Sequence, residues 1–450
     1  MTERVRCRNL QGKLRSIRQE LTLNVLWFSI NTQYAALVPI VIPTQVLLFV
    51  NSGEVGSVEQ ATFLGWLTAA ASVVSLFMPP LIGRLSDRTT SKFGRRRPYI
   101  ALGGLLLLIS TPFLVSSSTM VIFLVGLSIL HIGNNIVNSA YQSLVPDRVP
   151  EERRGEASGF VGAMTILGNV AGLGLAAGLL SGINQHNLNQ DIIRSHVGIF
   201  YLIAAAVVLV GLLITLIGVH EVPLKPGEHT RPQEKEHVKH RFTRWFTRNW
   251  VEPWRSYNFT VVFLTRSSIM MGLALFMTFI EYYFARVQHL ANFVEVTAIV
   301  AVLSLGGGVV SGILSGIFSD RLPRRAPLVS AATISMSITA VAFVIFPSSL
   351  SVWLWPLGIL FGLGYGVYMS VDWALSIDAL PSLEHAGKDL GLWDSSVTLP
   401  AIIAPLLGSL IINIANHFGQ TELGYRLVFT VAAIFLVVAA ICVLFVRERK

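Results

Sequence analysis

The residues between 131 and 142 carry polar and aromatic side chains at helical spacing within an otherwise apolar stretch. Their intervals of three, four and seven residues place them on one face of a helix. Polar groups in hydrocarbon are costly unless paired, so this face should point into the protein or into a wet cavity. Amides can hydrogen-bond sugar hydroxyls and rings can stack on a sugar, whereas hydrogen bonding between helices is the plainer use. The set comprises His131, Asn134, Asn135, Asn138, Tyr141 and Gln142.

A shorter version of this pattern lies in the apolar stretch 21–50. Trp27, Asn31 and Tyr34 are spaced for one face of a helix. Together with Tyr365, much later in the chain, they complete the candidate substrate contacts. The amides, hydroxyls and rings of these two patterns carry no fixed charge, which suits a sugar.

Few ionisable side chains fall deep within the apolar stretches, and the candidates for ion coupling are Arg266, Asp372 and Asp394. Arg266 lies ~14 Å beyond Tyr257, where its stretch begins, and Asp372 lies ~9 Å before Asp378, where the chain returns to the same side, at the rise of an α-helix. An unpaired charge at that depth is expensive, so we expect these two residues to pair. A sharper hypothesis is a switch in which protonation of Asp372 releases Arg266. Glu281 and Glu295 lie near the ends of their stretches, where we expect them to be solvated.

The composition requires lipid as the solvent for most of the chain. Charged residues make up 13% of the 450 residues and hydrophobic residues 53%, whereas a soluble domain carries ~25% charged residues. Mean hydropathy is +0.62. A span needs ~20 apolar residues, and twelve such stretches predict an all-α membrane protein with twelve transmembrane helices. They are roughly 21–50, 61–83, 99–116, 119–142, 156–181, 197–219, 257–284, 294–318, 327–346, 351–376, 389–413 and 424–446.

The basic residues fall in alternate connections between these stretches. Thirty of the 34 Lys and Arg residues lie in the two tails and in every second connection. By the positive-inside rule, both termini are cytoplasmic. The formal net charge of +9 therefore reflects topology, and we expect no nucleic-acid partner. We expect an integral protein of a bacterial cell (inner) membrane, with the first stretch as an uncleaved insertion signal.

Two short motifs occur twice in the chain. The segment 83–88 (GRLSDR) returns as 316–321 (GIFSDR), 233 residues later. The segment 147–150 (DRVP) returns as 378–381 (DALP), 231 residues later. Two separate motifs that repeat at nearly one period indicate that the chain contains an internal duplication.

The duplication predicts the domain organisation. We expect two pseudo-symmetric six-helix bundles, 1–219 and 257–450, joined by a hydrophilic cytoplasmic linker at 220–256. The substrate site is expected between the bundles near the membrane midplane. The offset of 231 makes Asp372 the equivalent of Tyr141.

The loop motifs carry a resemblance to a known family. The segment 83–88, with the basic turn after it, resembles the cytoplasmic loop motif of the major facilitator superfamily. Its longer form, 86–98 (SDRTTSKFGRRRP), resembles the sucrose/proton symporter branch and the glycoside–pentoside–hexuronide:cation symporters. The segment 131–142 is similar to the fourth helix of those symporters. The resemblance implies the major facilitator fold and transport by alternating access.

The resemblance also implies gating residues. In that superfamily the loop Asp holds the cytoplasmic side shut, and at Gly83 we expect close backbone approach. The gating set is Gly83, Asp87, Arg88, Gly94, Arg95, Asp320 and Arg321. The sequence departs from the sucrose symporters at two positions. The first is His131, which stands where they have an Asp linked to proton coupling. Gln142 stands where they have an Arg linked to substrate.

The leading interpretation is a secondary active transporter of a sugar or glycoside, driven by a proton or sodium gradient and monomeric. A major facilitator efflux antiporter for amphipathic compounds is the alternative. An enzyme is not expected, because the sequence has no paired-carboxylate or Cys–His constellation, and no phosphate loop indicates an ATP-driven pump. Cys7 and Cys442 lie at opposite ends of the chain, so we expect no metal site; we also expect no cofactor.

Overall fold

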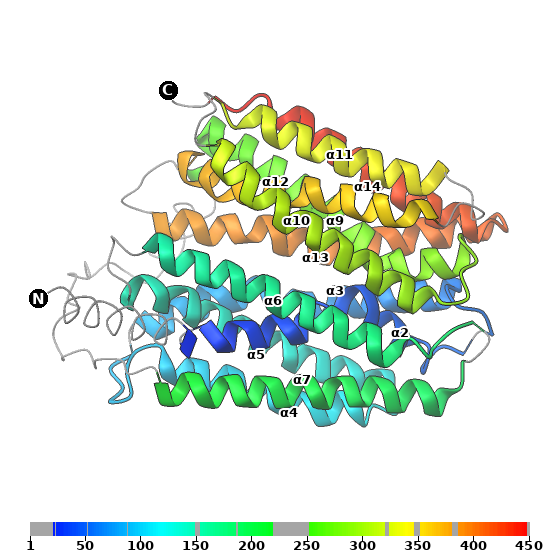
Figure 1. The fold of residues 1–450 in the computed structure, drawn as a ribbon, viewed down its shortest axis with the longest axis horizontal. Coiled ribbons are helices and arrows are strands. Elements are labelled where there is room, and N and C mark those ends of the chain that lie inside the picture. The colour runs from blue at the N-terminus through cyan, green and yellow to red at the C-terminus, as the bar shows by residue number, and fades with distance from the viewer. Residues whose placement is uncertain are drawn as a thin grey trace, which may run out of the picture. The chain divides into compact units, whose positions relative to one another are not determined.

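The computed structural model describes residues 21–22, 24–51, 53–87, 89–148, 154–185, 188–218, 252–319, 324–345, 352–379 and 386–447. Twelve helices in these ranges are long and apolar enough to cross a membrane, which confirms the predicted all-α class. Figure 1 shows the helices coloured along the chain. In chain order the elements are η1 (Leu37–Val41), α2 (Ile42–Val46), α3 (Val58–Asp87), α4 (Arg97–Val115), α5 (Met120–Arg148), α6 (Arg154–Leu180), α7 (Gln190–Gly218), η4 (Glu252–Arg255), α9 (Tyr257–Arg286), α10 (Phe293–Ser319), α11 (Ala326–Ile345), α12 (Leu354–Ala379), α13 (Ala386–His417) and α14 (Thr421–Val443).

The first span, Asn24–Val46, changes its helical winding part-way. Residues 24–34 are α-helical, η1 is a π-helix and α2 is α-helical again. Pro39 and Pro43 lack the amide hydrogen that an α-helix would bond to the fourth residue before them. A π-helical turn accommodates such an interruption without ending the span.

Packing divides the described residues into two compact units, which we describe separately. The first unit contains the residues up to Ala36, Phe77–Leu175, and the residues from Gly198 to the end of α7. The second contains Leu37–Leu76, Ala176–Val197, and η4 with α9 to α14. The predicted division at 1–219, 220–256 and 257–450 follows the sequence repeat instead. It stays a prediction, and of the linker only residues 252–256 are described.

Glycines let the helix backbones of the first unit approach closely. A Cβ on Gly103 of α4 would lie 2.7 Å from the carbonyl oxygen of Gly133 in α5. A Cβ on Gly168 of α6 would lie 2.5 Å from the carbonyl oxygen of Phe28 in the first span. Such contacts exclude any side chain. They fix α6 against the part of the first span that carries Trp27.

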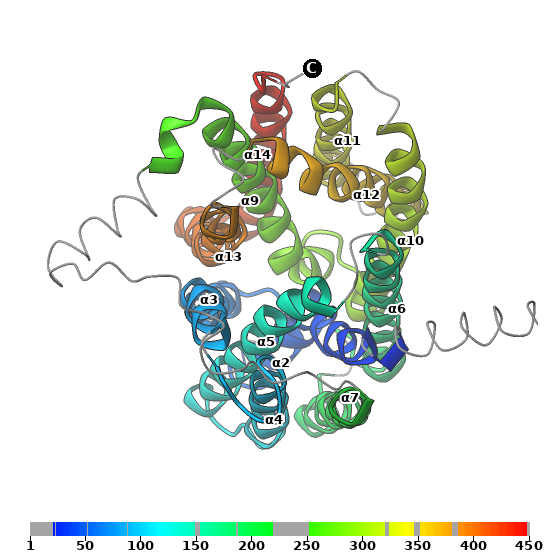
Figure 2. The same cartoon turned by 90° about the vertical axis from the view of Figure 1, so that its left-hand side faces the viewer.

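The second unit is held by a glycine contact and an aromatic core. A Cβ on Gly366 of α12 would clash with the carbonyl oxygen of Gly308 in α10. The rings of Phe276 (α9) and Phe361 (α12) stack with centroids 4.6 Å apart, and Phe429 (α14) lies 4.9 Å from Phe276. Phe343 of α11 lies 5.5 Å from the same ring. Figure 2 shows these four helices side by side. The rigid core orients the α9 and α12 side chains discussed below.

Candidate functional site

Three of the six residues on the predicted polar face of α5 are buried. His131 is 6% exposed, Asn134 is 8% exposed and Tyr141 is 1% exposed. Asn135 and Asn138 are half-buried. The side chain of Gln142 lies outside the described part of the structure. The spacing in the sequence therefore identified a face that the fold takes out of lipid.

Tyr34 joins the first span to this face. Its hydroxyl lies 3.1 Å from Nδ1 of His131, within hydrogen-bond distance. The two rings meet edge to face, with centroids 5.6 Å apart. The structure thus brings together one residue from each of the two predicted patterns.

Trp27 makes the second link between the first span and α5. Its ring stacks on Tyr141 with centroids 4.7 Å apart and an interplanar angle of 15°. The indole Nε1 donates a hydrogen bond of 2.6 Å to Oγ1 of Thr165 in α6. The Tyr141 hydroxyl donates to Oδ1 of Asn24. The sequence interpretation did not identify Asn24 or Thr165, although Asn24 lies three residues before Trp27 on the same face of the helix.

The amide groups of this region have hydrogen-bonding capacity to spare. Asn135 Nδ2 donates to the His131 carbonyl at 2.7 Å, and Asn31 Nδ2 donates to the Trp27 carbonyl at 2.8 Å. Asn134 Oδ1 is buried without a partner. Asn138 makes no side-chain hydrogen bond within the part of the chain that the structure describes. Unused amide donors and acceptors suit a ligand rich in hydroxyls.

We call these residues the amide–aromatic cluster. It combines stacked rings with amides, and within the first unit it draws on the first span and α5. Its members are Trp27, Asn31, Tyr34, His131, Asn134, Asn135, Asn138 and Tyr141.

The second unit contains a buried ion pair. Nη1 of Arg266 in α9 lies 2.9 Å from Oδ2 of Asp372 in α12, and the side chains are 14% and 10% exposed. The Arg266 guanidinium lies 4.9 Å from the ring centroid of Trp393 in α13. The expected pairing of Arg266 with Asp372 is therefore present, and an indole face adds to it.

Two tyrosines on α12 accompany the ion pair. Tyr365 is half-buried and Tyr368 is 1% exposed. Both hydroxyls lie near enough to Arg266 and Asp372 to interact electrostatically with each of them. Tyr365 thus lies beside the ion pair, although the sequence grouped it with the substrate contacts. The side chain of Asp394 lies outside the described part.

The predicted gating residues are described only in part. Arg88, Asp320 and Arg321, together with the side chain of Asp87, lie outside the described residues. Gly94 has a φ of 102°, which favours glycine. Arg95, the residue after it, is half-buried.

The close approach expected at Gly83 stays a prediction, and one feature of the loop was missed. No described atom lies within 4 Å of a Cβ built on Gly83. Arg96 is 4% exposed and its Nη1 donates to Oγ of Ser86. Arg97 Nη2 donates to the carbonyl oxygen of Leu216 in α7. These arginines therefore anchor the loop as well as adding positive charge to it.

Glu281 contradicts the expectation that it is solvated. It is 0% exposed, and its Oε1 accepts a hydrogen bond of 3.0 Å from Oγ1 of Thr44 in α2. Its Oε2 has no partner. The neighbouring Tyr282 hydroxyl donates to the carbonyl oxygen of Pro43 at 2.9 Å. The aromatic run around Glu281, from Phe276 to Phe284, was the available signal that this end of α9 is buried.

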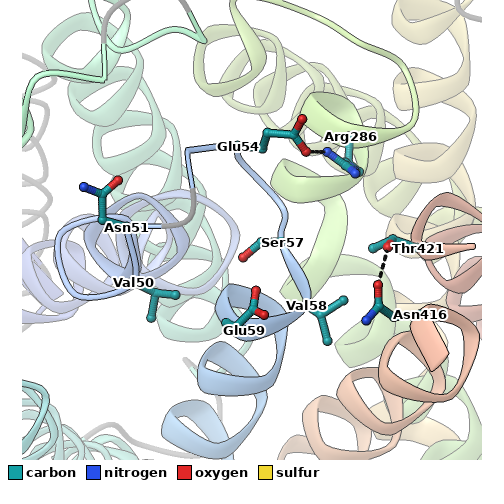
Figure 3. A pocket seen from close by; sticks show the side chains of 9 residues that line it. All are labelled: Val50, Asn51, Glu54, Ser57, Val58, Glu59, Arg286, Asn416 and Thr421. Carbon is teal, nitrogen blue, oxygen red and sulfur yellow. Dashed lines mark hydrogen bonds and ion pairs between the residues drawn. The ribbon is translucent and has the colours of Figure 1, made fainter. Parts of the chain in front are cut away.

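Residues 53–57, which we call the strap, lie across this end of α9. Glu54 forms an ion pair with Arg286, as the dashed line in Figure 3 marks. The carbonyl oxygen of Gly56 accepts a hydrogen bond of 3.0 Å from the Tyr425 hydroxyl in α14. A Cβ on Gly56 would lie 3.1 Å from Arg286 Cβ, so the strap backbone approaches α9 closely.

A capping box fixes the end of the strap at the start of α3. Ser57 Oγ accepts from the Gln60 amide at 3.2 Å, and Gln60 Oε1 accepts from the Ser57 amide at 3.3 Å. Beside the strap lies an open polar pocket of about 430 Å³. Figure 3 shows its lining: Val50, Asn51, Glu54, Ser57, Val58, Glu59, Arg286, Asn416 and Thr421.

The sequence profile of the Major Facilitator Superfamily matches residues 28–388. The chain belongs to this superfamily. It is therefore a membrane transporter, as the loop motifs predicted. Solved structures agree on the fold: the nucleoside transporter NupG superposes with a TM-score of 0.67 at 14% identity, and covers 96% of this chain and 100% of its own. A D-xylose-proton symporter superposes with a TM-score of 0.66 at 16% identity, over 94% of this chain and 97% of that chain.

Similarity to curated members of the superfamily is distant and covers part of their length. A general alpha-glucoside permease of Schizosaccharomyces pombe is 25% identical over 40% of this chain and 34% of its own. Sucrose transport protein SUC4 of Arabidopsis thaliana is 28% identical over 35% of each chain. The matches thus span about a third of these relatives. They bear out the resemblance to the sucrose symporter branch.

Proposed function

We propose that this secondary transporter carries a sugar or glycoside, and that the amide–aromatic cluster contacts it. The observation that carries the proposal is that stacked Trp27 and Tyr141 rings lie in one cluster with Asn134 and Asn138, and that Asn134 Oδ1 and the Asn138 side chain have no hydrogen-bond partner among the described residues. Sugars offer hydroxyls for the amides and apolar faces for the rings. A buried amide without a partner is costly, so a ligand that satisfies it gains affinity.

The Arg266–Asp372 pair is proposed to couple transport to a proton or sodium gradient. Release of Arg266 when Asp372 is neutralised would change the local charge at a position buried between helices. His131 and Asp394 are the alternative coupling residues. The gating roles of Gly83, Asp87, Arg88, Gly94, Arg95, Asp320 and Arg321 are part of the same proposal.

The relatives support the sugar proposal by what their names state. One is an alpha-glucoside permease and others are sucrose transport proteins. The fold by itself does not choose a substrate, because solved structures of similar fold include a nucleoside transporter and a D-xylose-proton symporter. The choice therefore depends on the cluster.

A thermal-shift screen of the purified protein tests the substrate class. The panel contains mono- and disaccharides, with nucleosides and amphipathic dyes as competing classes. A ligand that binds only the folded protein raises its melting temperature. A shift with saccharides alone supports the proposal, whereas a shift with dyes alone, followed by dye efflux from vesicles, favours an efflux antiporter.

We further propose that both termini face the cytoplasm of a bacterial cell. Single cysteines at Asn51 and Ser118, which are exposed, should react with an impermeant maleimide added to intact cells. A cysteine at Thr90 should react only after permeabilisation. Labelling of Thr90 in intact cells would reverse the topology.

A further inference from the structure

Glu281 is a buried carboxyl group that the proposed substrate and coupling residues do not include. It is 0% exposed, and among the described residues only Oε1 of its two oxygens has a partner, Thr44 Oγ1. An ionised carboxylate without a counter-charge is very costly in such a place. The neutral carboxylic acid avoids most of that cost.

No described cation is paired with Glu281. Arg286, one and a half turns further along α9, is ion-paired with Glu54. Arg426 of α14 donates to the carbonyl oxygen of Val344. The segment Leu37–Val46, which contributes Thr44, contains no titratable side chain. The other titratable groups towards this end of α9, α10, α13 and α14 are Tyr282, Tyr283, His289, Glu295, His417, Glu422 and Tyr425.

The contacts around Glu281 are the ones that hold α2 and the strap on α9. Thr44 of α2 bonds Glu281 itself, and the Tyr282 hydroxyl bonds Pro43. The strap closes over Arg286 through Glu54 and over α14 through Gly56. Separation of these segments from α9 would expose the carboxyl group to water.

We propose that Glu281 is a proton-binding site, and that its protonation holds α2 and the strap closed over α9. In the closed arrangement a proton from water bonds to one carboxyl oxygen, which leaves a neutral acid. In the open arrangement the acid returns the proton to water and the carboxylate is hydrated. Because the closed form binds the proton more tightly, protonation must in turn favour closure. Proton binding at Glu281 does not depend on the proposed function. A role for this closure in the transport cycle does rest on it.

The polar pocket lies towards the same end of α9 as Glu281. Arg286 lines the pocket, and Glu281 lies five residues earlier on the same helix, ~7.5 Å along its axis. Glu54 and Glu59 also line the pocket, whereas Glu281 does not. Separation of the strap from α9 would therefore bring water to a carboxyl group that is now covered.

Infrared difference spectroscopy tests protonation directly. The full-length protein in nanodiscs is titrated with pH, and the carbonyl stretch of protonated carboxylic acids is followed. We expect a band that Glu281→Gln removes and that Asp372→Asn retains. Thr44→Val, which deletes the hydrogen bond to Oε1, should shift the frequency of that band. A band that is unchanged in both Glu281→Gln and Thr44→Val overturns the proposal. A Glu281 side chain that remains an ionised carboxylate at every pH while the strap is closed also overturns it.

Cysteine accessibility tests the link to closure. Val55 of the strap is 4% exposed, whereas Asn51 beside it is exposed. In a background with Cys7→Ser and Cys442→Ser, the rate of maleimide labelling at Val55→Cys is divided by the rate at Asn51→Cys. This ratio removes the pH dependence that the two thiols share, and the same ratio in Glu281→Gln controls for the ionisation of the buried thiol. We expect it to rise several-fold with increasing pH in the parent and to stay low in Glu281→Gln.

The outcomes separate this proposal from the sugar proposal, because neither measurement needs a substrate. A pH-independent ratio in the parent overturns the link to closure. The ratio of labelling rates is also measured at fixed pH in sodium and in choline. If it changes between these two cations, the site binds a metal cation instead of a proton. If both tests succeed while no saccharide shifts the melting temperature, the proton site stands and the substrate proposal fails.

Discussion

Tyr141 and Asp372, which the sequence repeat predicts to be equivalent, have different chemical surroundings. Tyr141 of α5 stacks on Trp27 and donates to Asn24, within a cluster that has no ion pair among its described residues. Asp372 of α12, 231 residues later, pairs with Arg266. In the first site Asn134 Oδ1 and the Asn138 side chain have no hydrogen-bond partner among the described residues, whereas the second is occupied by its own charges. The difference is consistent with the proposal that the first site recognises the substrate and the second couples transport to an ion gradient.

Energetics separate the two sites in the same way. Breaking a buried ion pair from one side leaves an uncompensated charge and costs about 3–5 kcal/mol. Loss of one neutral hydrogen bond in a polar cluster costs about 1–3 kcal/mol. Substitutions in the charged site should therefore affect both stability and coupling. Substitutions in the uncharged cluster should mainly affect affinity.

The largest effect is expected for Asp372→Asn. It should abolish accumulation of the proposed sugar against its gradient while counterflow continues, because the carboxyl group proposed to bind the coupling ion is gone. Stability should fall by about 3–5 kcal/mol because Arg266 loses its partner. Proteoliposome uptake and thermal unfolding measure the two effects.

A double variant controls for the loss of stability. Arg266→Gln with Asp372→Asn removes both charges, so it should recover much of the stability but none of the accumulation. If Asp372→Asn still concentrates the sugar, the coupling residue is elsewhere, and His131 or Asp394 is tested next.

The next effect concerns the amides of α5. Asn138→Ala and Asn135→Ala should weaken sugar binding roughly five-fold to over a hundred-fold, from the loss of one hydrogen bond each. Asn138 has no internal side-chain bond among the described residues, so its removal should leave the melting temperature nearly unchanged. Titration calorimetry with the saccharide from the screen measures the affinity.

Ser139→Ala is the matched control for these amides. Ser139 lies on the same helix and is half-buried, but its hydroxyl is bonded at 2.8 Å to the carbonyl oxygen of Asn135. It should bind sugar normally. Normal binding by the folded asparagine variants would instead make the amides packing residues.

The smallest effect is expected at the stacked pair. Tyr141→Phe keeps the stack on Trp27 and loses the bond to Asn24, whereas Tyr141→Leu loses both. A double-mutant cycle with Trp27→Leu and Tyr141→Leu should give a coupling energy of about 0.5–1.5 kcal/mol in unfolding. A coupling energy near zero would mean that the two rings contribute independently.

The sequence predicted the parts of the molecule that depend on local pattern. Long apolar runs gave the twelve spans, because each must satisfy its backbone hydrogen bonds within itself in lipid. Helical periodicity gave the buried face of α5, and the cost of buried charge gave the pairing of Arg266 with Asp372.

The parts that depend on contacts distant in sequence were missed. Glu281 seemed close enough to a helix end to reach water, but Thr44, 237 residues earlier, covers it. Thr165 bonds Trp27 across 138 residues, and no local spacing signals such a partner. The close backbone approaches at Gly168 and Gly366 likewise join helices distant in sequence.

One measurement tests the division between recognition and coupling most directly. Sugar uptake into proteoliposomes is followed with and without an imposed proton gradient, for the parent, Asn138→Ala and Asp372→Asn. Asn138→Ala should raise the half-saturating concentration but keep the stimulation by the gradient. Asp372→Asn should lose the stimulation but keep the half-saturating concentration of the parent. If both variants change the half-saturating concentration, or both lose the stimulation by the gradient, the two sites do not have separate functions.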